Sequence, residues 1–145
     1  MKSKLFVLLG MFSAFAVSAP AFAHHSFAAE FDIHKPFVLK GVVTKIDWMN
    51  PHTYFYVDVQ NKAGQVANYA LEMGSPNGLA RMGWNRNSLH VGDVVTVQGF
   101  LAKDGTAKGN VKSVVLASGQ QLFSQRKGFG NQENGGKIHY KNLND

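Results

Sequence analysis

The sequence contains no cysteine. This absence excludes disulfide bonds, metal sites built from thiolates and a lipid anchor attached to cysteine. The fold must therefore be stabilised by its hydrophobic core alone. Acidic residues are also few, with nine Asp and Glu against fifteen Lys and Arg, so the formal net charge is +6. The basic residues are scattered rather than clustered, which favours a solvated surface over a nucleic-acid interface.

Recognisable catalytic motifs are missing as well. The sequence has no G-x-S-x-G element or phosphate loop, and it pairs no nucleophile with a base and an orienting group. The segment Gly128-Phe129-Gly130 lies in a polar stretch, without the strand-to-helix context of a dinucleotide site. No His-x-x-x-His pair could hold a metal on a helix. These absences predict that the chain is not an enzyme.

The first twenty-three residues have the three parts of a secretory signal peptide. Lys2 and Lys4 precede an apolar run over residues 5–17, and Ala21-Phe22-Ala23 forms a small-x-small cleavage site. The run is too short to span a bilayer as a stable helix. We therefore predict a cleaved signal peptide over residues 1–23, a periplasmic location and no integral membrane segment in the mature chain.

The central part of the chain has a β pattern. Stretches rich in β-branched and aromatic residues, separated by turn signals, predict five strands and a short edge strand. The five strands cover residues 37–48, 52–59, 65–73, 94–101 and 111–116, and the edge strand covers residues 120–123. Between the third and fourth strands, Ser75-Pro76 predicts the start of a short helix and Gly83 predicts its end.

This order of elements is typical of the OB-fold, a five-stranded and partly open barrel. The predicted fold class is mainly β, a five-stranded OB-like small barrel with one short helix between strands 3 and 4. A small β-sandwich or a differently closed barrel is the alternative. The predicted organisation is a lead segment over residues 24–36, the OB-like domain over residues 37–123 and a flexible polar tail over residues 124–145.

Several short motifs together resemble a family of uncharacterised bacterial periplasmic proteins whose domain has no known function. These motifs are His24-His25-Ser26-Phe27, Lys40-Gly41-Val42-Val43, Trp48-Met49-Asn50-Pro51-His52, Glu72-Met73-Gly74-Ser75-Pro76-Asn77, Gly83-Trp84 and Val91-Gly92-Asp93. The resemblance implies a small secreted domain and brings no established activity. More distantly, the chain is similar to bacterial periplasmic OB-fold proteins, which are regarded as binding modules.

Histidines provide the first candidate site. Cleavage after Ala23 would leave a free α-amine on His24, beside its own imidazole and that of His25. His52 follows a turn and could complete the site together with the adjacent Met49, and Met73 is a second nearby thioether. Amine and imidazole nitrogens suit Cu(II), and a thioether suits Cu(I). We therefore predict a copper-binding module with no other cofactor, the alternative being solvated histidines that bind metal only adventitiously.

A polar and aromatic face provides the second candidate site. The predicted alternation places Tyr54 and Tyr56 opposite the core-facing side chains, with Asn68 and Glu72 facing outward on the next strand. This face is the usual ligand surface of an OB-fold. It would serve a small ligand or another periplasmic protein, because nucleic acid is disfavoured by the compartment. In the alternative interpretation, the tyrosines only satisfy β-propensity or pack under a neighbouring segment.

Overall fold

The computed structural model describes residues 27–125 and 138–145. The predicted signal peptide over residues 1–23, and the candidate ligands His24 and His25, lie outside the described residues. No helix within the described ranges has the length and apolar character needed to cross a membrane.

The described residues form seven strands and one short helix between the third and fourth strands. Their bounds are β1 (Phe31–Asp47), β2 (Tyr54–Gln60), β3 (Val66–Glu72), α3 (Pro76–Ala80), β4 (Val94–Ala102), β5 (Lys108–Val115), β6 (Gln121–Phe123) and β7 (Lys141–Asn142). Residues 27–30, just before β1, are also helical.

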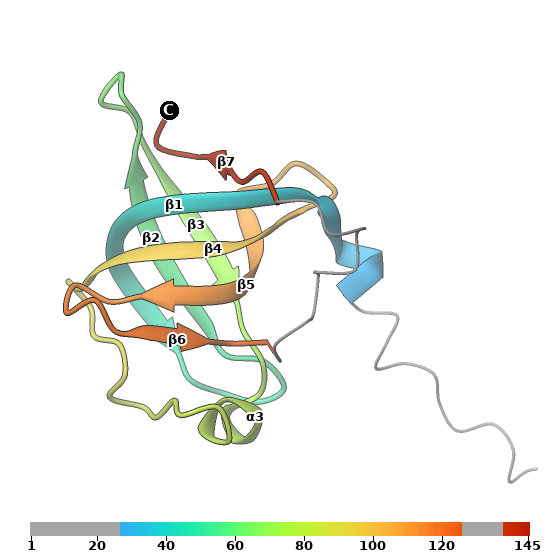
Figure 1. Cartoon of the computed structure of the whole chain (residues 1–145), viewed down its shortest axis with the longest axis vertical. Coiled ribbons are helices and arrows are strands. Elements are labelled where there is room, and N and C mark those ends of the chain that lie inside the picture. Colours follow the sequence, from blue (N-terminus) through green and yellow to red (C-terminus); the bar gives the residue numbers. More distant parts are fainter. Residues whose placement is uncertain (1–26, 126–137) are drawn as a thin grey trace, which may run out of the picture.

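Five of the strands close into a ring (Figure 1). The long strand β1 is antiparallel to β4 along residues 36–42 and antiparallel to β2 along residues 42–47. β2 continues the ring to β3, and a parallel pairing between β3 and β5 joins that side to β4. The predicted fold class is confirmed: the chain is mainly β, with five strands in OB order and a short helix after the third.

The core lies inside the ring, because alternate residues of each strand point inward. In β2, Phe55, Val57 and Val59 are buried as the alternation predicts. The largest core side chains from the other strands of the ring include Phe37, Leu39, Leu71, Val95, Val97, Val111 and Val114. Gly41 lies where β1 bends over β2. A Cβ atom added there would be only 2.3 Å from the Asp58 carbonyl oxygen, so a side chain does not fit at this position.

The helix α3 begins as the sequence predicts. The Ser75 hydroxyl accepts a hydrogen bond from the Gly78 backbone N–H at 3.2 Å, and Pro76 occupies the first helical turn. The chain then leaves the helix, and Gly83 adopts a positive φ of 93°. Leu79 on α3 and the neighbouring Trp84 are buried, which attaches this connection to the core.

Several predicted boundaries differ from the structure. β5 begins at Lys108 rather than at residue 111, and α3 ends at Ala80, before Gly83. β1 begins at Phe31 rather than at residue 37, because Phe31 is buried and pairs with Ala102 of β4. A register shift between Phe31 and Pro36 interrupts that pairing, and proline also lacks the N–H of a regular ladder. Two parts of the predicted flexible tail pack against the strands. Ser124 is buried, and residues 141–142 form β7 beside β1.

Candidate functional site

A buried carboxylate lies at the end of β3. Leu71 points into the core, so its neighbour Glu72 faces the other side of the sheet. Glu72 is nevertheless only 5% exposed. A buried carboxylate needs partners for its charge, because transfer of an unpaired charge out of water is very unfavourable. The residues that supply those partners define the candidate site.

Three side chains surround the Glu72 carboxylate. The Tyr54 hydroxyl donates a short hydrogen bond to Oε2, and the His52 imidazole Nδ1 lies 2.7 Å from Oε1. The Lys108 ammonium is 4.0 Å from Oε2 and also forms an ion pair with Glu30. Lys108 further lies 5.6 Å from the centre of the Tyr54 ring. The carboxylate is therefore fully engaged by this network.

The sheet register places these groups together. Tyr54 is directly opposite Glu72 in the β2–β3 ladder, and Asn110 is opposite Glu72 in the parallel β3–β5 ladder. Side chains opposite one another in neighbouring strands lie on the same face of a sheet. His52 lies two residues before Tyr54, after the cis peptide between Asn50 and Pro51. Three adjacent strands thus contribute to a single cluster.

A hollow of about 200 Å³ adjoins this cluster. Its walls combine aromatic, thioether, imidazole, carboxylate and amide groups. The lining residues are Phe27, His52, Glu72, Met73, Gly74, Asn110, Ser124 and Gln125. The Gln125 side-chain oxygen is buried and has no hydrogen-bond partner among the described residues. The hollow is therefore lined by both polar and apolar groups, and it adjoins a buried acceptor that no described group uses.

Residues 27–30, just before β1, pack beside this hollow. The Phe27 ring meets the Phe100 ring edge to face, with 6.0 Å between the ring centres. The Lys103 ammonium donates to the Ala28 carbonyl oxygen at 2.5 Å, and its backbone N–H donates to the Glu30 carbonyl oxygen at 2.9 Å. These contacts hold residues 27–30 against the domain. Phe27 and His52 line the same hollow.

The imidazole of His52 has one engaged and one available nitrogen. When Nδ1 carries the proton that points to Glu72, Nε2 of the neutral ring presents a lone pair. The His52 side chain is 40% exposed, so this part of the ring can meet a ligand. When a histidine binds a metal through one ring nitrogen, the other ring nitrogen commonly donates a hydrogen bond to a carboxylate, which orients the ring.

Among the predicted metal ligands, the structure places only His52 at the hollow, since His24 and His25 lie outside the described residues. His52 lines the hollow, whereas Met49 is 56% exposed and does not line it. A different thioether, that of Met73, belongs to the lining. No group of three or more His, Cys, Asp or Glu side chains that could hold a metal occurs in the described parts of the chain.

The predicted tyrosine face exists, but one member differs from expectation. Tyr54, Tyr56, Asn68 and Glu72 belong to the same face of β2 and β3. Glu72 is buried rather than outward and free, because Tyr54, His52 and Lys108 cover it. Tyr56 lies under the Lys45 ammonium at 4.9 Å from its ring centre. The Asn68 amide donates to the Asp58 carboxylate at 2.7 Å.

Sequence reasoning missed the contributors from β5 and beyond. Lys108, Asn110 and Gln125 reach the cluster only because β5 lies parallel to β3. Parallel pairing between strands more than thirty residues apart leaves no local signal in the sequence. Glu30 and Phe31 were missed as well, because they lie in a segment whose apolar residues show no clear periodicity.

The model of the family of unknown function DUF6152 matches residues 13–112. The chain belongs to this family. The matched range includes Glu30, His52, Tyr54, Glu72 and Lys108. A search of curated proteins finds no match.

A solved structure shares part of the architecture. It is the crystal structure of the mitochondrial single-stranded DNA-binding protein Rim1 from S. cerevisiae. The two chains are 15% identical, with a TM-score of 0.46, and the match covers 57% of this chain and 94% of the other.

The Tyr54 hydroxyl in this DUF6152 protein should make stability depend on pH. Burial and then the hydrogen bond to the Glu72 carboxylate raise the pKa of Tyr54 above its ordinary value of 10.0. Above about pH 10, the unfolded chain loses a proton that the folded chain keeps. The contribution of Tyr54 is therefore complete below that pH and declines as the pH rises.

We expect Tyr54→Phe to lower the free energy of unfolding by about 1.5 kcal/mol near neutral pH, since a hydrogen bond to a charged acceptor is lost. The deficit should shrink at about pH 11. Urea unfolding at both pH values would measure it. Tyr56→Phe, which removes a neighbouring hydroxyl without a bond to Glu72, is the matched control. A deficit of equal size at both pH values would contradict the prediction.

Proposed function

We propose that this protein is a periplasmic, non-enzymatic binding module that holds a copper ion. In this proposal the primary ligands are the α-amine and imidazole of His24 and the imidazole of His25, and His52 completes the site. The supporting observation is the position of Phe27, which lines the same hollow as His52. Cleavage after Ala23 would place the new amino terminus three residues before Phe27.

Chain reach is compatible with this arrangement. An extended residue spans at most about 3.6 Å, so the His24 amine would lie within about 11 Å of Phe27. The hollow is bordered by Phe27 itself, and His52 lies on its wall. The reach of three residues is therefore compatible with N-terminal ligands at the hollow that His52 lines.

The donor set favours copper among the divalent metals of the first transition row. An amine and two or three imidazoles are nitrogen ligands, and affinity for such sites is greatest with Cu(II). The Glu72 carboxylate would orient the His52 ring and increase its basicity. The Met73 thioether on the wall could contact Cu(I) after reduction, in the role that the sequence assigned to Met49.

A Cu(II) titration of the processed protein tests the proposal. The mature N-terminus must first be verified by intact mass. We expect one-to-one binding that weakens at least about 100-fold when the α-amine of His24 is acetylated, because a blocked amine cannot act as a ligand. His52→Gln should weaken binding about tenfold. His90→Gln, which alters an exposed histidine beside Asp93, is the matched control and should change nothing.

Equal affinity in the processed protein with a free and with an acetylated amino terminus would refute the copper proposal. The tyrosine face would then become the leading candidate, serving a small ligand or a partner protein without metal. In that case, Tyr56→Ala combined with Asn68→Ala should abolish binding of the partner and leave the weak copper binding unchanged.

A further inference from the structure

The helical turn at residues 27–30 is attached to the domain through aromatic rings. The centre of the Phe27 ring lies 5.7 Å from that of Phe31 and 6.0 Å from that of Phe100. Both partners are almost fully buried, with exposed fractions of 2% for Phe31 and 1% for Phe100. Phe31 is the first residue of β1 and Phe100 belongs to β4, so these contacts join the turn to two paired strands of the ring.

Lys103 binds the backbone of the same turn. Its ammonium donates to the Ala28 carbonyl oxygen at 2.5 Å, and its backbone N–H donates to the Glu30 carbonyl oxygen at 2.9 Å. The final carbonyl groups of a helix have no partners within the helix, and a lysine side chain near that end can donate hydrogen bonds to them. Lys103 therefore supplies donors to two carbonyl oxygens that this short turn cannot satisfy by itself.

Lys103 is separate from the buried carboxylate network. Lys108 also reaches the turn, since its ammonium pairs with the Glu30 carboxylate and lies 5.7 Å from the centre of the Phe31 ring. Lys108 contacts Glu72 as well, so a substitution of Lys108 would disturb both places. In the described part of the chain, no hydrogen bond or ion pair joins Lys103 to Glu72. A change at Lys103 therefore tests the turn alone.

We propose that Lys103 is a positioning residue for the copper site, an inference that rests on the proposed function. Phe27 and His52 line the same hollow, and His24 lies three residues before Phe27 in the sequence. By holding the turn, Lys103 keeps the N-terminal nitrogen ligands close to the His52 imidazole. Tethered ligands meet a shared metal at a high effective concentration, which falls when the connection between them is loosened. Lys103 thereby determines how strongly His52 contributes to copper affinity.

A double-mutant cycle tests this role. Lys103→Met keeps the aliphatic part of the side chain and removes the donor to Ala28. We expect this substitution to weaken one-to-one Cu(II) binding about fivefold in the chain with His52, and less than about twofold in the His52→Gln chain. The loss of a positive charge acts on copper equally in the two backgrounds, so the difference between them reports the position of the N-terminal segment. Lys103→Arg retains a donor and should restore most of the affinity.

A measurement on the copper-free protein follows the same contact. The backbone N–H at position 103 is bonded to the Glu30 carbonyl oxygen, so its hydrogen exchange reports how often the turn opens. Lys103→Met should raise this exchange about fivefold relative to its intrinsic rate, because one of the two hydrogen bonds that Lys103 donates to the turn is gone. Circular dichroism should show that the variant remains folded.

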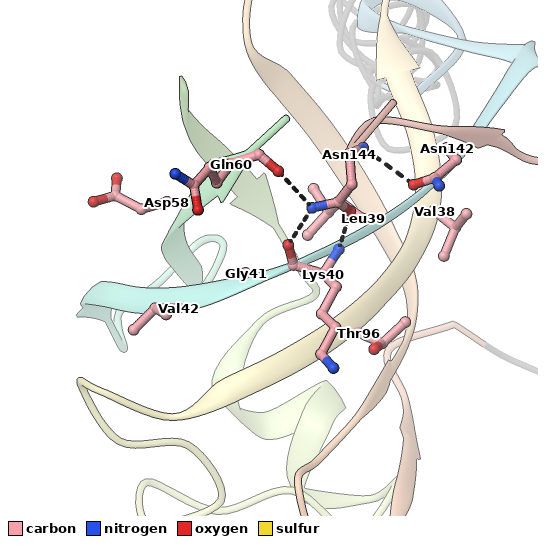
Figure 2. A pocket seen from close by; sticks show the side chains of 10 residues that line it. All are labelled: Val38, Leu39, Lys40, Gly41, Val42, Asp58, Gln60, Thr96, Asn142 and Asn144. Carbon is pink, nitrogen blue, oxygen red and sulfur yellow. Dashed lines mark hydrogen bonds between the residues drawn. The ribbon is translucent and has the colours of Figure 1, made fainter. Parts of the chain in front are cut away.

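The C-terminal segment supplies the matched control. The Asn144 carboxamide is bonded to the Lys40 backbone, with Oδ1 accepting from the N–H at 2.7 Å and Nδ2 donating to the carbonyl oxygen at 2.8 Å (Figure 2). This contact borders a hollow of about 650 Å³ along β1, and no described residue lines both this hollow and the one at His52. Asn144→Ala therefore loosens a terminal segment away from the copper site. It should leave copper affinity and hydrogen exchange at position 103 unchanged.

Three results would overturn this inference. The first is unchanged hydrogen exchange at position 103 in Lys103→Met, which would show that other contacts hold the turn. The second is an equal loss of copper affinity in the two backgrounds, or no loss in either, while acetylation of the His24 amine still weakens binding. The copper proposal would then stand without a role for Lys103. The third is copper binding that acetylation does not affect, which would refute the copper proposal and with it the role of Lys103.

Discussion

Replacing Gly99 by alanine should lower the free energy of unfolding by about 3 kcal/mol or more. Gly99 is a buried residue of β4, at the point where the pairing with β5 shifts register. A Cβ atom there would lie 2.2 Å from the Asn110 carbonyl oxygen and 3.0 Å from the Phe37 ring. The nearer contact is with backbone, so relief requires β4 and β5 to separate and disturbs the ring.

Urea unfolding followed by tryptophan fluorescence would measure this loss. Gly74→Ala is the matched control, because its added Cβ would meet nothing closer than the Ser124 carbonyl oxygen at 4.0 Å. We expect that variant to stay within about 0.5 kcal/mol of the wild-type chain. Similar midpoints for the two variants would show that β4 and β5 can separate without disrupting the core.

The second large effect is expected at Glu72. Glu72→Ala removes the acceptor of Tyr54 and His52 and leaves Lys108 with Glu30 alone. Removing one partner of a buried charge network lowers the free energy of unfolding by about 3–5 kcal/mol, because the remaining polar groups lose their partners. Glu72→Gln keeps the shape and some hydrogen bonds, so it should cost about 1–2 kcal/mol.

Two measurements distinguish the roles of this carboxylate. Denaturant unfolding gives its contribution to stability, and Glu30→Gln serves as the control because Glu30 is an exposed partner of Lys108 whose loss should cost below about 1 kcal/mol. Cu(II) titration of the folded Glu72→Gln chain gives its contribution to the site, with an expected loss of about tenfold. Unchanged copper affinity would show that Glu72 supports the fold without orienting His52.

Strands and core were predictable because each depends on residues close together in the sequence. The alternation around Phe55, Val57 and Val59 allows only one face of β2 to be apolar, so the buried face follows directly. The pair Ser75-Pro76 has the side-chain oxygen and the restricted φ that begin a helix. The order of these elements was sufficient to predict the five-stranded OB-like arrangement.

The candidate site was predictable only in part. The pattern correctly placed Tyr54 and Glu72 on one face of neighbouring strands. It could not show that Glu72 is buried, because the covering groups come from His52 before β2 and from Lys108 on β5. Met49 was chosen for its nearness to His52 in the sequence, but the turn between them directs it into solvent.

By itself, the sequence determined the β class, the order of the strands from β1 to β6, the core faces and the short helix, but not β7. These features follow from side-chain periodicity and turn chemistry, which act over a few residues. The tertiary structure decided the parallel contact of β3 with β5, the burial of the Glu72 network and the docking of Asn144 on Lys40. Each of these includes a contact between residues more than thirty positions apart, and such a contact depends on how the whole ring closes rather than on any local preference.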